Sequence, residues 1–219
     1  IVAGVDFAKA FDSISHEYII KLLRGLHLPD YFVDAVATLY ASPEACVINN
    51  STTTKYFQVG RSCRQGDPIA PYLFILAIEP LLRQIKHDGQ IAGLETPSRQ
   101  VKLTAYADDI TLLVKDQPSL DRALETIDEF GRISGLLLNR DKTEIMHLRS
   151  DEEGQKETIK VTGVVHASIG KRRQAEKENF EPVISALQNA VNTWKLRGLS
   201  LTGRAMVAKA QGWALFQHI

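Results

Sequence analysis

Runs of apolar residues, some continuous and some at helical spacing, predict strands and helices in mixed order along the chain. Residues 1–5 form an apolar run that ends at Asp6 and predicts a strand. Ser15 precedes apolar residues at helical spacing, so we expect it to cap a helix, and a second helix begins at Pro29. The other expected elements are strands at 46–49 and 56–59 around a turn at 50–54, a helix at 72–85, strands at 101–106 and 110–114, a helix that begins at 118 and ends within 131–135, a strand at 144–148, and helices at 180–194 and 203–216.

The order of these elements favours one fold class. Successive strands meet through short polar turns, without the regular strand–helix–strand alternation of parallel sheets. We therefore predict an α+β fold, an antiparallel sheet with helices on one face, followed by a small helical segment. Residues 151–170 are polar and poorly patterned, and we expect them to form a connection.

Composition excludes several classes of protein. The 219 residues include 44% hydrophobic and 24% charged side chains, as in ordinary globular domains. Cys46 and Cys63 cannot form a disulfide framework, which favours a reducing intracellular setting. The longest apolar run, 69–78, is too short to span a membrane, and no signal peptide is visible, so we expect no membrane partner.

The zero net charge hides an uneven distribution. Residues 171–209 contain eight basic and three acidic residues, so the rest of the chain is acidic. Two interpretations stay open: a solvated helix face, or a segment that contacts nucleic-acid phosphates.

Three carboxylates form the main candidate for chemistry. Asp6 follows the first strand, and Asp108 and Asp109 lie between two later strands. If these strand ends meet, the carboxylates repel one another unless a hard cation lies between them. Mg²⁺ prefers such oxygen ligands, and two ions can assist a phosphoryl displacement. The alternative is that Asp108 and Asp109 are ordinary turn residues.

The sequence around these carboxylates resembles the palm of a reverse transcriptase. Residues 6–12, 64–71 and 106–109 are similar to motifs A, B and C in order and spacing, and 138–143 resembles motif D. Residues 194–204 resemble the segment that follows the palm in non-LTR (LINE-type) retrotransposons. The resemblance covers nearly the whole chain.

The resemblance implies a metal site and a nucleotide site. Asp6 and Asp108 would hold two Mg²⁺ ions, for which Mn²⁺ can substitute, while Asp109 and the backbone carbonyl of Phe7 would complete the ligands. Phe11 occupies the position of the ring that excludes a 2′-hydroxyl, and the alternative for Phe11 is a core aromatic. Three further residues would lie beside the nucleotide: Gln65, Gly66 and Tyr106.

The resemblance also implies partners and an organisation. Lys142 would protonate the departing pyrophosphate, or else is a solvated turn lysine, and Arg197 and Arg204 would contact nucleic-acid phosphates. The expected organisation is a palm at 1–150, a connection at 151–174 and the start of a helical thumb at 175–219. The substrates would be an RNA template, a DNA primer and dNTPs, within a ribonucleoprotein of the nucleus and cytoplasm. Fingers and endonuclease regions of a parent polyprotein are expected as further partners, and without fingers the fragment is expected to be weakly active or inactive.

Two other functions stay open at this stage. An RNA-dependent RNA polymerase shares the palm, and Asp12 lies where some of these enzymes recognise the 2′-hydroxyl, although Ala107 replaces their usual glycine. A decayed copy that only binds nucleic acid is the other alternative. Among reverse transcriptases, the 194–204 segment favours a retrotransposon over a group II intron or a retron.

Overall fold

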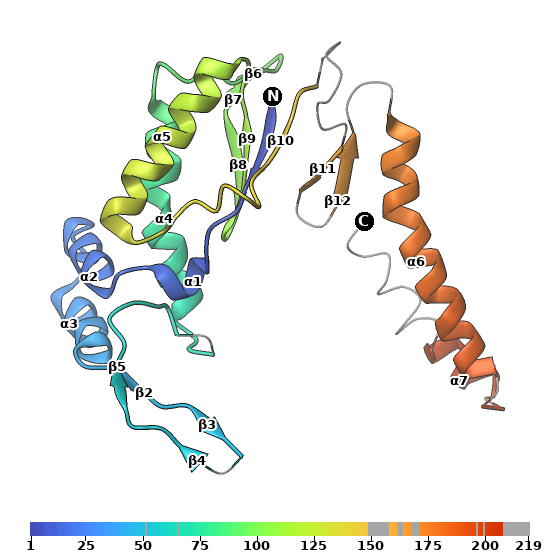
Figure 1. Ribbon diagram of the computed structural model, residues 1–219, viewed down its shortest axis with the longest axis horizontal. Helices are drawn as coiled ribbons and strands as arrows, with labels where there is room; N and C mark the ends of the chain where they lie inside the picture. Colours follow the sequence, from blue (N-terminus) through green and yellow to red (C-terminus); the bar gives the residue numbers. More distant parts are fainter. Residues whose placement is uncertain are drawn as a thin grey trace. The chain divides into compact units, whose positions relative to one another are not determined.

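The computed structural model confirms an α+β fold with antiparallel strand pairing (Figure 1). The structure describes residues 1–50, 52–64, 66–148, 158–161, 164–167, 171–195, 197–198 and 200–207. Two compact units form: one contains Val5–Thr143, and the other contains Ile1–Gly4 together with Glu144–Ile219. Among the described residues, no helix is both long and apolar enough to cross a membrane.

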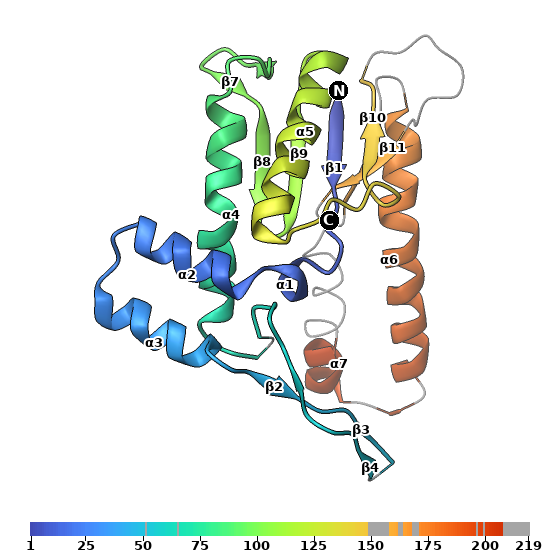
Figure 2. The same cartoon turned by 60° about the vertical axis from the view of Figure 1, so that its left-hand side comes forward.

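The Val5–Thr143 unit is built on two long helices and a hairpin. Helix α4 (Ala70–His87) packs against helix α5 (Gln117–Ser134) and against strand β8 (Leu103–Tyr106), which pairs with β9 (Asp109–Leu113) (Figures 1 and 2). The core of this unit includes fully buried side chains from all three regions: Phe74, Leu81, Ile85, Ile110, Leu112, Leu120 and Ile127. Burial of these apolar side chains is the main stabilising contribution to the unit.

Shorter elements surround this core. Helix α1 (Ala10–Ser13) leads into α2 (His16–Gly25) and α3 (Asp30–Tyr40). Ser15 caps α2 as predicted, because its hydroxyl accepts a hydrogen bond from the backbone N–H of Tyr18. The Tyr18 hydroxyl donates to the carbonyl of Ala77 and so ties α2 to α4.

Four two-residue strands build a projecting arm between α3 and α4. Strand β2 (Glu44–Ala45) pairs with β5 (Phe57–Gln58), and β3 (Ile48–Asn49) pairs with β4 (Thr52–Thr53) (Figure 1). The predicted strand–turn–strand is therefore present with shorter strands. A second small hairpin, β6 (Leu94–Glu95) and β7 (Gln100–Val101), lies between α4 and β8.

The other unit contains the ends of the chain. Strand β1 (Val2–Val5) pairs with β10 (Glu144–Met146). Strands β11 (Thr158–Val161) and β12 (Val164–Ala167) form a hairpin in the region that we expected to be an irregular connection. Asn179 holds this hairpin to helix α6 (Arg172–Lys195), since its amide donates to the Val165 carbonyl at 2.8 Å and its oxygen accepts from the Val165 N–H at 2.7 Å.

The helices of this unit also differ from the predicted ranges. Helix α6 begins eight residues earlier than predicted, and α7 covers Leu201–Val207, so the later part of the expected helix lies outside the described residues.

Candidate active site

Backbone hydrogen bonds fix Asp6 immediately after strand β1. Its N–H donates to the Thr143 hydroxyl at 3.5 Å, and its carbonyl accepts from the Asn139 N–H at 2.8 Å. Ala8 continues the contact by donating to the Leu137 carbonyl at 2.9 Å. The segment after α5 therefore holds the residues of motif A in place. The sequence identified Asn139 and Thr143 as parts of motif D but did not indicate that they anchor Asp6.

The β8–β9 hairpin carries the other two carboxylates. Tyr106 pairs with Asp109 across the hairpin, so the turn consists of Ala107 and Asp108 alone. The prediction that Asp109 lies in the turn was wrong, because cross-strand pairing extends to the first residue of β9. Ala107 has a φ of 52°, a left-handed conformation that is uncommon for a residue with a side chain.

The three carboxylates interact electrostatically. The pKa of Asp109 is raised above its usual value, first by partial burial, then by the negative charge of Asp108 and then by that of Asp6. Mutual repulsion of this kind is relieved by a cation, and carboxylate oxygens suit a hard divalent ion. In the part of the chain that the structure describes, however, no three histidine, cysteine or acidic side chains lie close enough together to hold a metal ion. The donor chemistry therefore fits a divalent ion, but the side chains are not arranged around one.

Two phenylalanines follow Asp6 in different surroundings. Phe7 is buried and forms an isolated antiparallel bridge with Leu138. Phe11, at the start of α1, is half-buried, and its ring stacks on Phe74 of α4 with 4.2 Å between ring centroids and 20° between planes. The Phe11 carbonyl also accepts a hydrogen bond from the Cys63 N–H at 2.7 Å. Phe11 is thus held at both its backbone and its ring while part of it remains accessible.

The partner of Phe11 was not identified from the sequence. Phe74 is fully buried within a strongly apolar helix, so its pattern predicts a core residue, and nothing local shows that its ring faces motif A.

The residues of motif B lie in the loop before α4. Gln65 lies outside the described residues. Gly66 is exposed with a φ of 88°, and a Cβ added there would meet no atom within 4 Å. Asp67 stabilises the entry to α4, because its carboxylate accepts a hydrogen bond from the Ile69 N–H at 3.1 Å. Glycine at position 66 therefore permits a left-handed backbone conformation, and no neighbouring atom limits the size of its side chain.

The remaining predicted residues are spread over both units. Tyr106 is the last residue of β8 in the carboxylate hairpin and is 78% exposed, and Lys142 is exposed in the turn next to Thr143. Arg197 belongs to the other unit, where its guanidinium lies 5.0 Å from the centre of the Trp194 ring. Arg204 lies in α7, and its side chain is outside the part that the structure describes.

Relatives of this chain are proteins of non-LTR retrotransposons. The Transposon TX1 uncharacterized 149 kDa protein of Xenopus laevis is 31% identical over 217 residues, which cover 93% of this chain and 16% of that protein. The Pol polyprotein of the type-2 retrotransposable element R2DM of Drosophila melanogaster is 33% identical over 141 residues, 64% of this chain and 13% of the polyprotein. The chain therefore spans less than a fifth of the length of these relatives.

Solved structures support the fold, and a family description covers most of the chain. The apo telomerase of Candida tropicalis, truncated from its C-terminal domain, superposes with a TM-score of 0.58 at 12% identity, covering 77% of this chain and 34% of that one. Telomerase of Candida albicans in complex with a fragment of telomeric RNA gives 0.57 at 13% identity, over 76% of this chain and 30% of that one. Residues 1–166 match the family described as reverse transcriptase (RNA-dependent DNA polymerase), and the chain therefore belongs to this family.

Proposed function

We propose that this chain carries the polymerase site of a non-LTR retrotransposon reverse transcriptase, which adds dNTPs to the 3′-hydroxyl of a primer on an RNA template. The main support is that the charge of Asp6 acts on Asp109, which also lies beside Asp108, although 103 positions separate Asp6 from Asp109 in the sequence. Family membership supports the same reaction. The activity is a proposal for this chain because it spans a small part of each relative.

The carboxylates would hold divalent cations with the help of the Phe7 carbonyl. When bound, two such ions lower the pKa of the attacking hydroxyl and stabilise charge on the triphosphate. We propose Mg²⁺ as the ion, with Mn²⁺ as a substitute. The anchoring of Asp6 by Asn139 and Thr143 supports this role, since fixed backbone reduces the cost of arranging ligands.

Phe11 would form the wall of the sugar pocket and exclude a 2′-hydroxyl. Its ring cannot retreat from an added oxygen without leaving the stack with Phe74, and this supports a steric role. Gln65, Gly66 and Tyr106 would lie beside the nucleotide. Lys142 would donate a proton to the departing pyrophosphate, which is consistent with its exposed place next to Thr143.

The partners follow from the same reaction. We propose an RNA template and a DNA primer as ligands, with Arg197 and Arg204 contacting phosphates, in a ribonucleoprotein of the nucleus and cytoplasm. One of the similar telomerases is in complex with an RNA fragment, in agreement with an RNA ligand. Domain limits of 1–150, 151–174 and 175–219 remain predictions.

Primer extension tests this proposal directly. The chain is incubated with an RNA template, a DNA primer, Mg²⁺ or Mn²⁺, and either dNTPs or rNTPs. We expect dNTP incorporation that falls by several orders of magnitude in Asp108→Asn and is unchanged in Asp34→Asn, which alters an exposed carboxylate of α3. Measurable incorporation that is equal in wild type and Asp108→Asn would refute the assignment, and preference for rNTPs would support an RNA polymerase instead.

Metal binding gives a readout that does not depend on turnover. Titration with Mn²⁺ followed by electron paramagnetic resonance should show binding to wild type and to Asp34→Asn. Asp108→Asn should bind much more weakly. Identical titrations of all three proteins would contradict the proposed metal site even if the chain proves inactive.

A further inference from the structure

A second polar region lies at the other end of strand β8 from the carboxylates. A cavity of about 520 Å³ opens there, within the size range of ligand sites. It is lined by the end of α4, strand β7 and the start of β8, through Lys86, Arg99, Gln100, Val101, Lys102 and Leu103. Three of the lining residues are cationic and none is acidic, although the whole chain has no net charge.

Lys86 and Arg99 are not neutralised by ion pairs in the described part of the chain. Arg83, one turn earlier on α4, pairs with Glu79 at 2.7 Å. Lys86 has no acidic residue three or four positions away on its helix. Both Lys86 and Arg99 are exposed, so their charges are available to a ligand from solvent.

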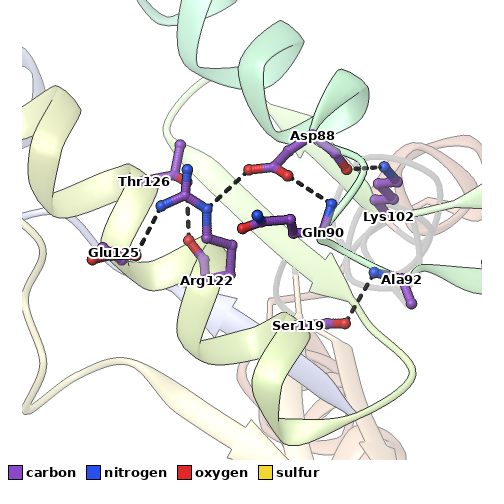
Figure 3. A network of polar contacts seen from close by, with 8 residues as sticks. All are labelled: Asp88, Gln90, Ala92, Lys102, Ser119, Arg122, Glu125 and Thr126. Carbon is purple, nitrogen blue, oxygen red and sulfur yellow. Dashed lines mark hydrogen bonds and ion pairs between the residues drawn. The ribbon is translucent and has the colours of Figure 1, made fainter.

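Asp88, which follows the last residue of α4, already has partners for its carboxylate (Figure 3). One oxygen of the Asp88 carboxylate accepts from the Arg122 guanidinium at 3.0 Å, and the other accepts from the Gln90 N–H at 2.8 Å. Lys102 donates to the main-chain carbonyl of Asp88 at 2.6 Å, which fixes its ammonium group and leaves it further protons to donate. Its charge is a smaller contribution to the lowered pKa of Asp88, behind the Gln90 N–H and Arg122. Glu95 lies opposite Gln100 in the β6–β7 pair but does not line the cavity.

The composition of the lining indicates the class of ligand. Cationic side chains attract phosphate, and the absence of an aromatic residue among the lining residues leaves no surface on which a base could stack. From Leu103 to Tyr106, β8 covers about 10 Å at roughly 3.3 Å per residue. The cavity therefore lies on the same unit as the carboxylates but is separate from them.

We propose that Lys86, Arg99 and Lys102 form a binding site for the phosphate backbone of a nucleic acid, independent of base sequence. This inference rests on the proposed polymerase function, which supplies a nucleic acid as the ligand. It adds a contact that lies outside the motifs of the candidate active site.

The salt dependence of binding measures the contribution of these cations. The dissociation constant of the chain for an RNA–DNA hybrid is measured at several salt concentrations for wild type and for the double variant Lys86→Gln/Arg99→Gln. Each lost phosphate contact lowers the slope of log affinity against log salt by about 0.7 to 0.9, so the double variant should lose about 1.4 to 1.8. The variant leaves Lys102 and its bond to Asp88 intact, which preserves the local fold.

A matched control removes two cations elsewhere. Lys21→Gln/Arg83→Gln changes the net charge equally, but both residues are paired with acidic neighbours, so the slope should stay near that of wild type. Equal slopes for wild type and for both double variants would overturn the proposal. A loss of slope on one base sequence only would also overturn it, because backbone contacts do not distinguish bases.

Two further arms separate the possible failures. If the Lys86/Arg99 variant loses affinity for inorganic pyrophosphate while its nucleic-acid slope is unchanged, the site binds free phosphates and the proposal is overturned. Primer extension by wild type tests the polymerase function separately: extension with an unchanged slope refutes this site alone. A reduced slope without extension still supports this site, because binding does not depend on turnover, and the Mn²⁺ titration of Asp108→Asn then tests the polymerase site.

Discussion

Replacing Gly135 with alanine should destabilise the Val5–Thr143 unit at the junction between α5 and motif A. Gly135 ends α5 with a φ of 89°, where a residue with a side chain is strained. A Cβ there would lie 2.5 Å from the Ser13 carbonyl oxygen, a backbone atom that cannot rotate away. The Ser15 N–H donates to the Ser134 carbonyl beside it, so the displacement would reach the segment that carries Phe11.

The expected loss of stability has two parts, backbone strain and a steric clash, and a comparison with Gly66 distinguishes them. Gly66 has nearly the same φ, 88°, but open space around the added Cβ. Gly66→Ala should therefore lower the free energy of unfolding by about 1 kcal/mol through backbone strain alone. Gly135→Ala should add about 1 to 3 kcal/mol from the steric clash, for a total of roughly 2 to 4 kcal/mol. That loss is a large part of the 5 to 15 kcal/mol typical of a domain.

Urea unfolding followed by far-ultraviolet circular dichroism measures both losses. With typical slopes for small proteins, Gly135→Ala should lower the midpoint by about 1 to 2 M, and Gly66→Ala by less than about 1 M. Gly89→Ala is the control, since Gly89 has no positive φ and no atom within 4 Å of an added Cβ. Equal midpoints for the Gly66 and Gly135 variants would refute the steric term and with it the close packing of the end of α5 on Ser13, at the end of α1.

Three further predictions concern other parts of this unit. Burial is the main cause that lowers the pKa of His16, so the folded protein binds a proton at His16 less readily than the unfolded chain, and its stability should fall as pH drops below about 6.5. The urea midpoint should therefore change less between pH 7.5 and 5.5 in His16→Gln than in wild type, and an equal change in both proteins would contradict this role. Phe74→Leu should lower discrimination between dNTPs and rNTPs because it removes the ring on which Phe11 stacks, whereas Phe74→Tyr should retain discrimination. The measurement is the steady-state ratio of dNTP to rNTP incorporation, and an unchanged ratio in both variants would exclude a positioning role for Phe74. Asp116→Ala should cost about 1 kcal/mol in thermal or urea unfolding, because its carboxylate accepts from the Ser119 N–H at the start of α5, and a loss near zero would show that the cap is dispensable.

Local patterns in the sequence predicted most elements because their causes are local. The apolar spacing of α2 and its cap at Ser15 depend on residues within one or two turns, and the structure confirms both. The apolar run before Asp6 likewise became β1. The β11–β12 hairpin was missed because each strand is only four residues long, too short for its pattern to stand out in a polar stretch, and strand pairing there depends on contacts with α6.

The sequence by itself determined the family, the order of the motifs and the identity of the candidate carboxylates, since these are properties of residue type and spacing. Only the tertiary structure decided that the charge of Asp6 helps to raise the pKa of Asp109 and that Phe11 stacks on Phe74. It also decided that Lys86 and Arg99 line one cavity. Each of these pairs is separated by more than ten positions, and no periodic pattern specifies which distant surfaces meet. That choice depends on burying the apolar faces of α4, α5 and the β8–β9 hairpin together, which is a property of the whole unit.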